Sequence, residues 1–299
     1  MSKFLLTNGD SWTFGSEIMC PEMLAPPGEK GYGMAGRYKE GKMDVDREND
    51  HYRIPRIWPT MLAHKMGVEH KNISWPARSN DTIMGSTINW VLENYIKPGK
   101  STEDLIVMIG WSSPERKDII IEDLDDNVHW YTMWPAMDTD QFYAGDVMKR
   151  YFKFYVQHLW IAREYIARYI EQNFHLHKFL ESHGIEHYFF NSFYIPGKIP
   201  LPIHEWIDVD LSAVINEWKN HQYGGWHDPM WTATDQINCI LNMWEQIPEE
   251  VFLEKKTHRS FKSHIDHTVS DELRMINMHP SPDGHSAWAT HLYETLFKS

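Results

Sequence analysis

Residues 104–110 read Asp-Leu-Ile-Val-Met-Ile-Gly and are apolar almost throughout. Such a segment is typical of a central strand in a parallel sheet, because helices cover both of its faces. Further short strands are predicted at residues 3–8, 72–75, 128–131 and 185–190, with helical periodicity between most of them. Strands that alternate with helices predict an α/β fold, a three-layer α/β/α sandwich with a mainly parallel central sheet.

The longest predicted helical segment lies within residues 146–183, which contain neither glycine nor proline. A single helix of that length would measure about 57 Å, so a break is predicted near residues 172–176. Two other stretches, at about 15–57 and 193–232, are rich in glycine and proline and lack periodicity. We interpret them as long irregular insertions in a single domain that spans residues 1–299.

The composition argues against several classes of partner. The chain of 299 residues carries 29 Lys and Arg against 42 Asp and Glu, a formal net charge of −13, so a nucleic-acid backbone would be repelled. Cys20 and Cys239 are too few for a disulfide framework and indicate a reducing compartment. The sequence shows no signal-peptide pattern and no apolar run near the roughly 18 residues that cross a bilayer. We therefore expect a soluble protein made in the cytoplasm, with no nucleic-acid or membrane partner.

A candidate nucleophile lies at the end of the first predicted strand. Gly9-Asp10-Ser11-Trp12 follows the apolar run Phe4-Leu5-Leu6 and predicts a tight turn. A serine at such a turn is well placed for catalysis, because the strand end is rigid and the following backbone N–H groups point outward. The alternative is an ordinary turn, since Asn8-Gly9-Asp10-Ser11 is also good turn chemistry. The turns at Ala77 and Gly110 also follow strands, at the edge where open α/β sheets bind ligands.

A serine nucleophile needs a base, a group that orients the base, and donors for the oxyanion. His279 is the candidate base. It lies in the loop Met278-His279-Pro280-Ser281-Pro282-Asp283-Gly284-His285, which its prolines stiffen just before the last predicted helix. The alternative is that His279 is one exposed histidine among 18.

These motifs resemble the four sequence blocks of the SGNH (GDSL-type) hydrolases, in order along the chain. Gly9-Asp10-Ser11 is similar to the first block, Ser79-Asn80 to the second, Gly110-Trp111-Ser112 to the third, and His279-Pro280 through Trp288 to the last. The resemblance implies that Ser11 is the nucleophile and His279 the base. It also implies an oxyanion hole from Ser11, Ala77 and Ser112, with Asp10 and Asn80 in support. The nearest likeness is to a divergent group encoded by tailed bacteriophages, which implies an infected bacterial cytoplasm or a virion as the location.

The sequence departs from the family pattern at three positions. Ala77 stands where the second block has a glycine, and Ser112 stands where the third block has an asparagine. Ile276 stands where the family has an aspartate three residues before the histidine. Removal of the carboxylate that orients the base lowers the rate by about 10⁴ in a serine protease. The candidate orienting groups that remain are Asn277, Asp271, Asp283 or a backbone carbonyl.

Other chemistries fit the sequence less well. His175, His177, His183 and His187 lack the accompanying ligands of a metal site, and we interpret them as polar positions near a helix end. The acidic residues 122–126 are interpreted as a solvated turn, with a calcium site as the alternative. No phosphate-binding glycine loop follows a strand. The sequence predicts neither a metal nor another cofactor.

Two hypotheses for function result. The first is a serine-dependent ester hydrolase, an esterase or deacetylase that acts on a small-molecule or polysaccharide ester such as an acylated saccharide. The second is a bacteriophage virion or assembly protein on the same fold, with reduced or lost catalysis and with other virion proteins or further copies of itself as partners. A particle-borne esterase would satisfy both hypotheses.

Overall fold

The computed structural model describes residues 3–24, 43, 45–122, 128–134, 145–159, 162–192, 198–200, 206–208, 233–255, 260–276 and 279–298. Residues 25–42 and 44 of the first predicted insertion, most of the second and most of the acidic segment 122–126 lie outside the described residues. The described part of the first insertion is not irregular throughout, because it contains helical turns at Pro21–Met23, Arg47–Asn49, Asp50–Arg53 and Ile54–Arg56. Asn277 also lies outside them.

A parallel sheet of four strands forms the centre of the fold, in the order β2-β1-β3-β6. Its strands are β1 (Phe4–Gly9), β2 (Glu69–Asn72), β3 (Leu105–Trp111) and β6 (Glu186–Asn191), and every neighbouring pair is parallel. Phe252 adds a parallel bridge to Phe189 on the outer side of β6. The prediction of an α/β fold with a mainly parallel central sheet is confirmed.

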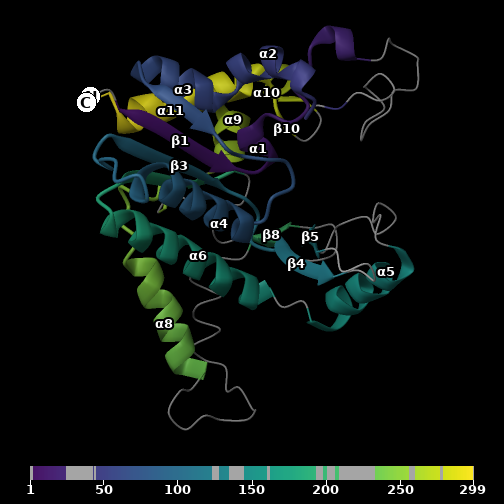
Figure 1. The fold of residues 1–299 in the computed structure, drawn as a ribbon. Helices are drawn as coiled ribbons and strands as arrows, with labels where there is room; N and C mark the ends of the chain where they lie inside the picture. The colour runs from purple at the N-terminus through teal and green to yellow at the C-terminus, as the bar shows by residue number, and fades with distance from the viewer. Residues whose placement is uncertain are drawn as a thin grey trace.

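Helices cover both faces of this sheet, as Figure 1 shows. One face carries α3 (Trp58–Met66), α9 (Phe261–Thr268) and α11 (Pro282–Leu296). The opposite face carries α4 (Asn80–Val91), α6 (Ala162–Ser182) and α8 (Ala233–Glu245). Successive strand residues point to opposite faces. Leu5 and Ile106 accordingly pack in the apolar cluster beneath α3, α9 and α11. Leu6 and Val107 pack in the cluster beneath α4, α6 and α8 on the other face.

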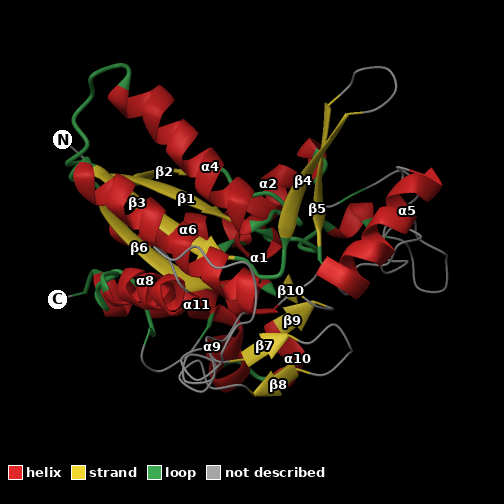
Figure 2. Ribbon diagram, turned by 90° about the horizontal axis from the view of Figure 1, so that it is seen from below, coloured by secondary structure: helices red, strands yellow, loops and turns green. Residues whose placement is uncertain are grey.

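An antiparallel hairpin lies outside the central sheet and extends away from it in Figure 2. It consists of β4 (Lys117–Glu122) and β5 (Val128–Met133). Two smaller ladders pair β7 (Lys198–Pro200) with β8 (Trp206–Asp208), and β9 (Met275–Ile276) with β10 (His279–Pro280). The remaining helices are α1 (Ser11–Phe14), α2 (Asp50–Arg53), α5 (Gly145–Phe154), α10 (Asp271–Arg274), 3-10 turns at Pro21–Met23, Arg47–Asn49 and Ile54–Arg56, and π-helical turns at Leu92–Ile96 and Tyr155–Leu159.

The predicted break near residues 172–176 is wrong, because α6 continues through them. The polar residues there have partners that suit a helix. The Asn173 amide donates to the Tyr169 carbonyl at 2.7 Å, and the Gln172 amide donates to Asp81 at 2.5 Å. The regular α-helix is interrupted earlier instead, where π-helical geometry begins at Tyr155.

The second strand begins at Glu69 and ends at Asn72, so the prediction of 72–75 placed it too late. The Asn72 side chain accepts hydrogen bonds from the Ser74 backbone N–H at 3.1 Å and from the Ser74 hydroxyl at 2.7 Å. The backbone stays beside β1 beyond Asn72, since the Ile73 N–H donates to the Thr7 carbonyl at 2.9 Å and the Trp75 N–H to the Gly9 carbonyl at 3.3 Å.

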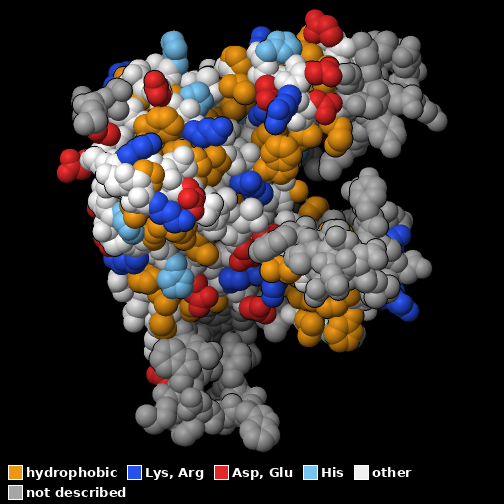
Figure 3. Space-filling view, in the orientation of Figure 1, with side chains coloured by type: hydrophobic (Ala, Val, Ile, Leu, Met, Phe, Trp, Pro, Cys, Tyr) orange, Lys and Arg blue, Asp and Glu red, His pale blue; other side chains and the backbone are white. Residues whose placement is uncertain are grey.

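In the described part of the chain, no helix combines the length and the apolar character needed to cross a membrane. Lysine and arginine side chains are interspersed with aspartate and glutamate on the face shown in Figure 3.

Candidate active site

Ser11 is the first residue of a helical turn at the carboxyl end of β1. The Asp10 carboxylate caps this turn by accepting the Trp12 N–H at 3.0 Å. Gly15 ends the turn with a left-handed φ of 82°. The strand end and the cap therefore fix the Ser11 backbone at the edge where β1 and β3 both finish. The N–H groups of Trp12, Thr13 and Phe14 all donate to Asp10, so they are not available for an oxyanion.

Two glycines allow this turn to pack closely against the sheet. Gly9 of β1 is paired in register with Gly110 of β3. A Cβ atom added to Gly9 would lie 2.3 Å from Thr13 Oγ1, and one added to Gly110 would lie 2.7 Å from the same atom. Both distances are too short for a side chain. The glycines of the first and third motifs thus leave space for the side chain of Thr13, a buried residue of this turn.

The C-terminal loop brings His279 to the Ser11 turn. β10, which begins at His279, is in contact with α1, which begins at Ser11. His279 Nδ1 lies 3.6 Å from a carboxylate oxygen of Glu17, and the two side chains are only 16% and 12% exposed. Glu17 adopts a left-handed φ of 67°, which is uncommon for a residue other than glycine. The carboxylate beside the candidate base therefore belongs to the same segment as the candidate nucleophile.

Glu17 is not among the orienting groups that the sequence predicts. Of those, Asp271 and Asp283 lie in α10 and α11 and are exposed. Ile276, at the position where the family has its aspartate, pairs in register with His279 in the β9–β10 ladder. The only sequence signal for Glu17 is an acidic residue within the first turns after Ser11, and that signal is not specific.

His285, the other histidine of the C-terminal motif, is unsuited to be the base. Its Nδ1 accepts the Trp58 backbone N–H at 3.2 Å, so the proton of the neutral ring is on Nε2. Burial lowers the pKa of His285 to about 3, and the proximity of His279 acts in the same direction. A histidine that stays neutral and has its lone pair occupied cannot accept a proton from a serine.

The second and third motifs meet at the same edge of the sheet. Asn80 exchanges two hydrogen bonds with the backbone of Ser112: its amide donates to the Ser112 carbonyl at 3.1 Å, and its carbonyl accepts the Ser112 N–H at 2.9 Å. Ala77 has a left-handed φ of 62°, a conformation that favours glycine. The Ser112 hydroxyl is buried, and no hydrogen-bond partner for it occurs among the described residues.

Arg116 connects these motifs and was also missed from the sequence. Its guanidinium lies 3.3 Å from the Asp10 carboxylate and donates to the Arg78 carbonyl at 3.4 Å. It also lies over the Trp134 ring at 5.5 Å. Asp10 is fully buried, and a buried carboxylate requires a cation or several donors to remain charged. That requirement predicts a cationic partner but does not identify which arginine supplies it.

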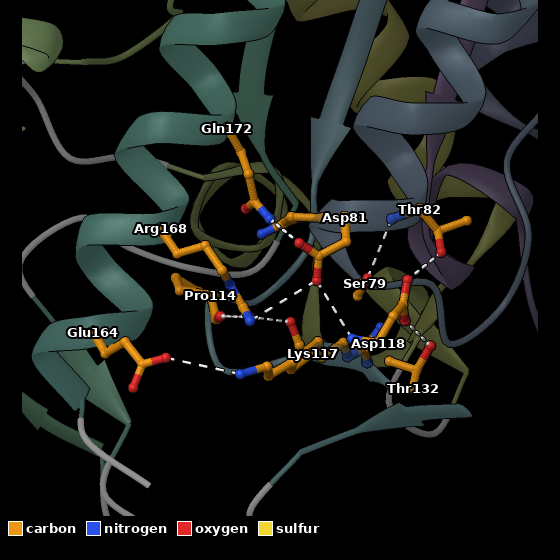
Figure 4. A network of polar contacts seen from close by, with 12 residues as sticks. Ser79, Asp81, Thr82, Pro114, Lys117, Asp118, Thr132, Glu164, Arg168 and Gln172 are labelled. Atoms are coloured by element: carbon orange, nitrogen blue, oxygen red, sulfur yellow. Dashed lines mark hydrogen bonds and ion pairs between the residues drawn. The ribbon is translucent and has the colours of Figure 1, made fainter. Parts of the chain in front are cut away.

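A network of polar contacts fixes the segment that carries Arg116, as Figure 4 shows. Arg168 of α6 donates to the Arg116 carbonyl at 2.8 Å and to the Pro114 carbonyl at 3.5 Å. Asp118 at the start of the hairpin accepts hydrogen bonds from Thr82 of α4 and, at 2.7 Å, from Thr132 of β5. These hydrogen bonds connect the hairpin and the segment after the third motif to α4 and α6.

Across the described ranges, no group of three or more His, Cys, Asp or Glu side chains is arranged to hold a metal ion. The edge of the sheet instead presents a serine, a histidine, a carboxylate and backbone or hydroxyl donors. These are the kinds of group that an acyl-transfer site uses.

The chain belongs to the family described as "Family of unknown function (DUF6071)", whose model matches residues 41–216. The matched range includes Ala77, Asn80, Ser112 and Arg116, but neither Ser11 nor His279. No curated protein matches the sequence.

Several solved structures are similar to this chain over nearly its whole length. A lipolytic-type protein of the G-D-S-L family from Desulfitobacterium hafniense is 11% identical, with 99% of this chain and 100% of that one covered and a TM-score of 0.40. A catalytic mutant of an acetylxylan esterase from Geobacillus stearothermophilus is 14% identical, with coverages of 99% and 94% and a TM-score of 0.38. A phospholipase A1 from Streptomyces albidoflavus is 12% identical, with coverages of 99% and 100% and a TM-score of 0.34. Likenesses this distant assign neither an activity nor a substrate to this chain.

Proposed function

We propose that this protein is a serine-dependent ester hydrolase with Ser11 as nucleophile, His279 as base and Glu17 as the group that orients the base. The observation that carries the proposal is the contact between the Glu17 carboxylate and His279 Nδ1, on a loop that touches the turn of Ser11. The carboxylate oxygen of Glu17 is 3.6 Å from Nδ1, just beyond hydrogen-bond distance, so its effect on the ring is electrostatic. A negative charge at this position stabilises the imidazolium ion that forms when Nε2 accepts the serine proton.

The proposed reaction follows from these positions. Ser11 Oγ attacks the ester carbonyl carbon while His279 Nε2 accepts the hydroxyl proton. The N–H groups of Ser11 and Ala77, with the Ser112 hydroxyl, stabilise the oxyanion. His279 then returns the proton to the leaving alcohol as the acyl–serine ester forms. Water repeats the sequence with His279 as base, which releases the acid and restores Ser11. Glu17 stabilises the imidazolium ion in both halves of the reaction.

An acylated saccharide is the substrate class that the site favours. The Trp75 ring is 49% exposed and stands two residues before Ala77. Its edge contacts Phe14 of the Ser11 turn, with the ring centroids 5.4 Å apart. An exposed indole can stack on an apolar sugar face. Replacement of Trp75 by alanine should therefore raise KM for an acetylated saccharide and leave KM for p-nitrophenyl acetate within about twofold.

Labelling with a fluorophosphonate probe, combined with hydrolysis of p-nitrophenyl acetate, tests the proposal. The wild-type protein should be labelled on Ser11, and Ser11→Ala should abolish both labelling and hydrolysis. Ser16→Ala is the matched control, because Ser16 is also a buried serine of the same segment but lies beyond the helical turn. Absence of labelling in the folded wild-type protein, or equal labelling of Ser11→Ala, would refute a nucleophilic Ser11.

A further inference from the structure

A cavity that is wide open to solvent lies at the edge of the sheet opposite to Ser11, where β3 and β6 begin. It has a volume of about 600 Å³. Glu103 precedes β3, and Glu186 is the first residue of β6, so the cavity is separated from Ser11 by the length of the strands. Its polar lining consists of Glu103, His177, Glu181, Glu186, His187 and Glu250.

Hydrogen bonds fix the proton positions on the two histidines. His187 Nδ1 lies 2.7 Å from the Ile185 carbonyl, which can only accept, so His187 carries its proton on Nδ1. His187 Nε2 therefore has the lone pair and accepts a hydrogen bond from His177 Nδ1 at 2.8 Å. His177 in turn has its proton on Nδ1, and its Nε2 carries a lone pair. The sequence predicts polar positions near a helix end for these histidines, but both of them are buried in the structure.

The lone pair of His177 faces a carboxylate instead of a donor. His177 is 2% exposed, and its Nε2 has no hydrogen-bond partner among the described residues. Glu181 Oε1, one helical turn later, lies 3.7 Å from this nitrogen. Lys178 binds the other oxygen of Glu181 at 2.7 Å. Burial and the neighbouring His187 lower the pKa of His177 to about 4. At neutral pH, His177 Nε2 therefore carries no proton that it could donate to Glu181. Two acceptors thus face each other without a donor between them.

The surrounding charges favour a cation at this position. The residues that line the cavity include four glutamates and neither lysine nor arginine. Lys3 pairs with Glu186 at 2.5 Å, and Lys255 near His177 is committed to the carbonyls of Trp244 and Ile247, both at 2.6 Å. A metal ion would find only two close ligands, because no group of three lies together in the described ranges. A primary ammonium has three N–H donors and suits the separate acceptors of the cavity.

We propose that this cavity binds a small organic cation through a primary ammonium group that donates to His177 Nε2 and Glu181. The aliphatic part of the ligand would lie along Ile185, Pro248 and Val251, which also line the cavity. The site does not depend on Ser11, so the proposal is separate from the ester hydrolase.

Calorimetric titration with putrescine tests the proposal, with 1,4-butanediol as the neutral compound of the same length. Wild type should bind putrescine and not the diol. Glu181→Gln should weaken putrescine binding at least tenfold, since it replaces a charged acceptor by a neutral amide. Glu171→Gln is the matched control: it removes one charge from the same helix outside the cavity. It should change the affinity by less than twofold.

Nitrogen NMR provides a second readout that does not depend on a variant. His177 Nε2 should resonate as an unprotonated nitrogen in the free protein and should shift when putrescine is added. Equal binding of the diol, equal weakening by both glutamine variants, or an unshifted His177 resonance would overturn the proposal. Zinc chloride that binds where putrescine does not would overturn it in favour of a metal site. The Ser11→Ala protein should bind putrescine as wild type does.

Discussion

Replacement of Glu17 by glutamine should lower kcat by about 10³ and leave KM nearly unchanged. The imidazolium of His279 forms only during the reaction, so its stabilisation by Glu17 affects the transition state and not substrate binding. At the observed separation of 3.6 Å and an effective dielectric constant of about 20, Coulomb's law gives about 4.6 kcal/mol. One decade in rate corresponds to about 1.36 kcal/mol. Partial screening by solvent at this edge reduces the effect toward 10³.

Two further variants separate charge from backbone strain. Glu17 has a left-handed φ of 67°, so Glu17→Gly relieves the backbone while it removes the carboxylate. Its kcat should fall as far as that of Glu17→Gln, although the protein should be no less stable to urea. Glu22→Gln, which changes an exposed glutamate five residues later, should have wild-type kinetics.

Steady-state hydrolysis of p-nitrophenyl acetate, together with the rate of fluorophosphonate labelling, measures these effects. A fall of less than tenfold in a folded, Ser11-labelled Glu17→Gln protein would refute the role of Glu17. A comparable loss in Glu22→Gln would mean that general charge, and not the contact with His279, controls the rate.

Three further predictions concern stability and pH. Ala77→Gly should retain activity, because glycine adopts the φ of 62° without strain. Its free energy of unfolding in urea titrations should equal that of wild type or exceed it by up to about 1 kcal/mol. A loss of more than about 1 kcal/mol would contradict the interpretation that Ala77 is strained. Arg116→Gln should destabilise the protein by about 2–3 kcal/mol in the same assay, since it leaves Asp10 buried without its cation, and an unchanged midpoint would refute that pairing. The pKa of His177 is about 4 in the folded protein and 6.5 in the ordinary, unfolded state. As the pH falls from 6.5 to 4, the unfolded chain therefore takes up a proton that the folded protein does not, and the fall favours unfolding. The contribution of His177 to stability is therefore complete above pH 6.5 and falls between pH 6.5 and 4, and His177→Gln should show a shallower pH dependence there.

The sequence predicts the parts of this fold that depend on local patterns. The run at 104–110 becomes a strand that is buried throughout its length. The helical break was predicted from the length of the segment alone, which does not say where a break falls. At the predicted position the helix continues, with the Gln172 and Asn173 amides bonded to Asp81 and to the Tyr169 carbonyl. A hydrogen bond to a residue of another helix or strand does not show in the hydrophobic periodicity of the sequence, so it cannot be predicted from that periodicity.

The same distinction applies to the candidate site. Ser11, Ala77 and Ser112 could be located because each follows a strand, and the edge of a parallel sheet collects such positions. Glu17 could not, because its approach to His279 depends on how the first and last segments of the chain pack together. The roles of these residues, and the association with a bacteriophage particle, stay predictions.

The position of Glu17 changes what a C-terminal histidine motif has to conserve. Ser11 and Glu17 lie on one short N-terminal stretch, and the backbone of Ile276 pairs with His279 in the β9–β10 ladder. Under the proposed roles, the carboxylate that faces the base would come from the N-terminal end of the chain, and position 276 would need only to shape the loop that carries His279. A motif search that demands an acid next to the histidine would then overlook a carboxylate that reaches the same ring from the other end of the polypeptide.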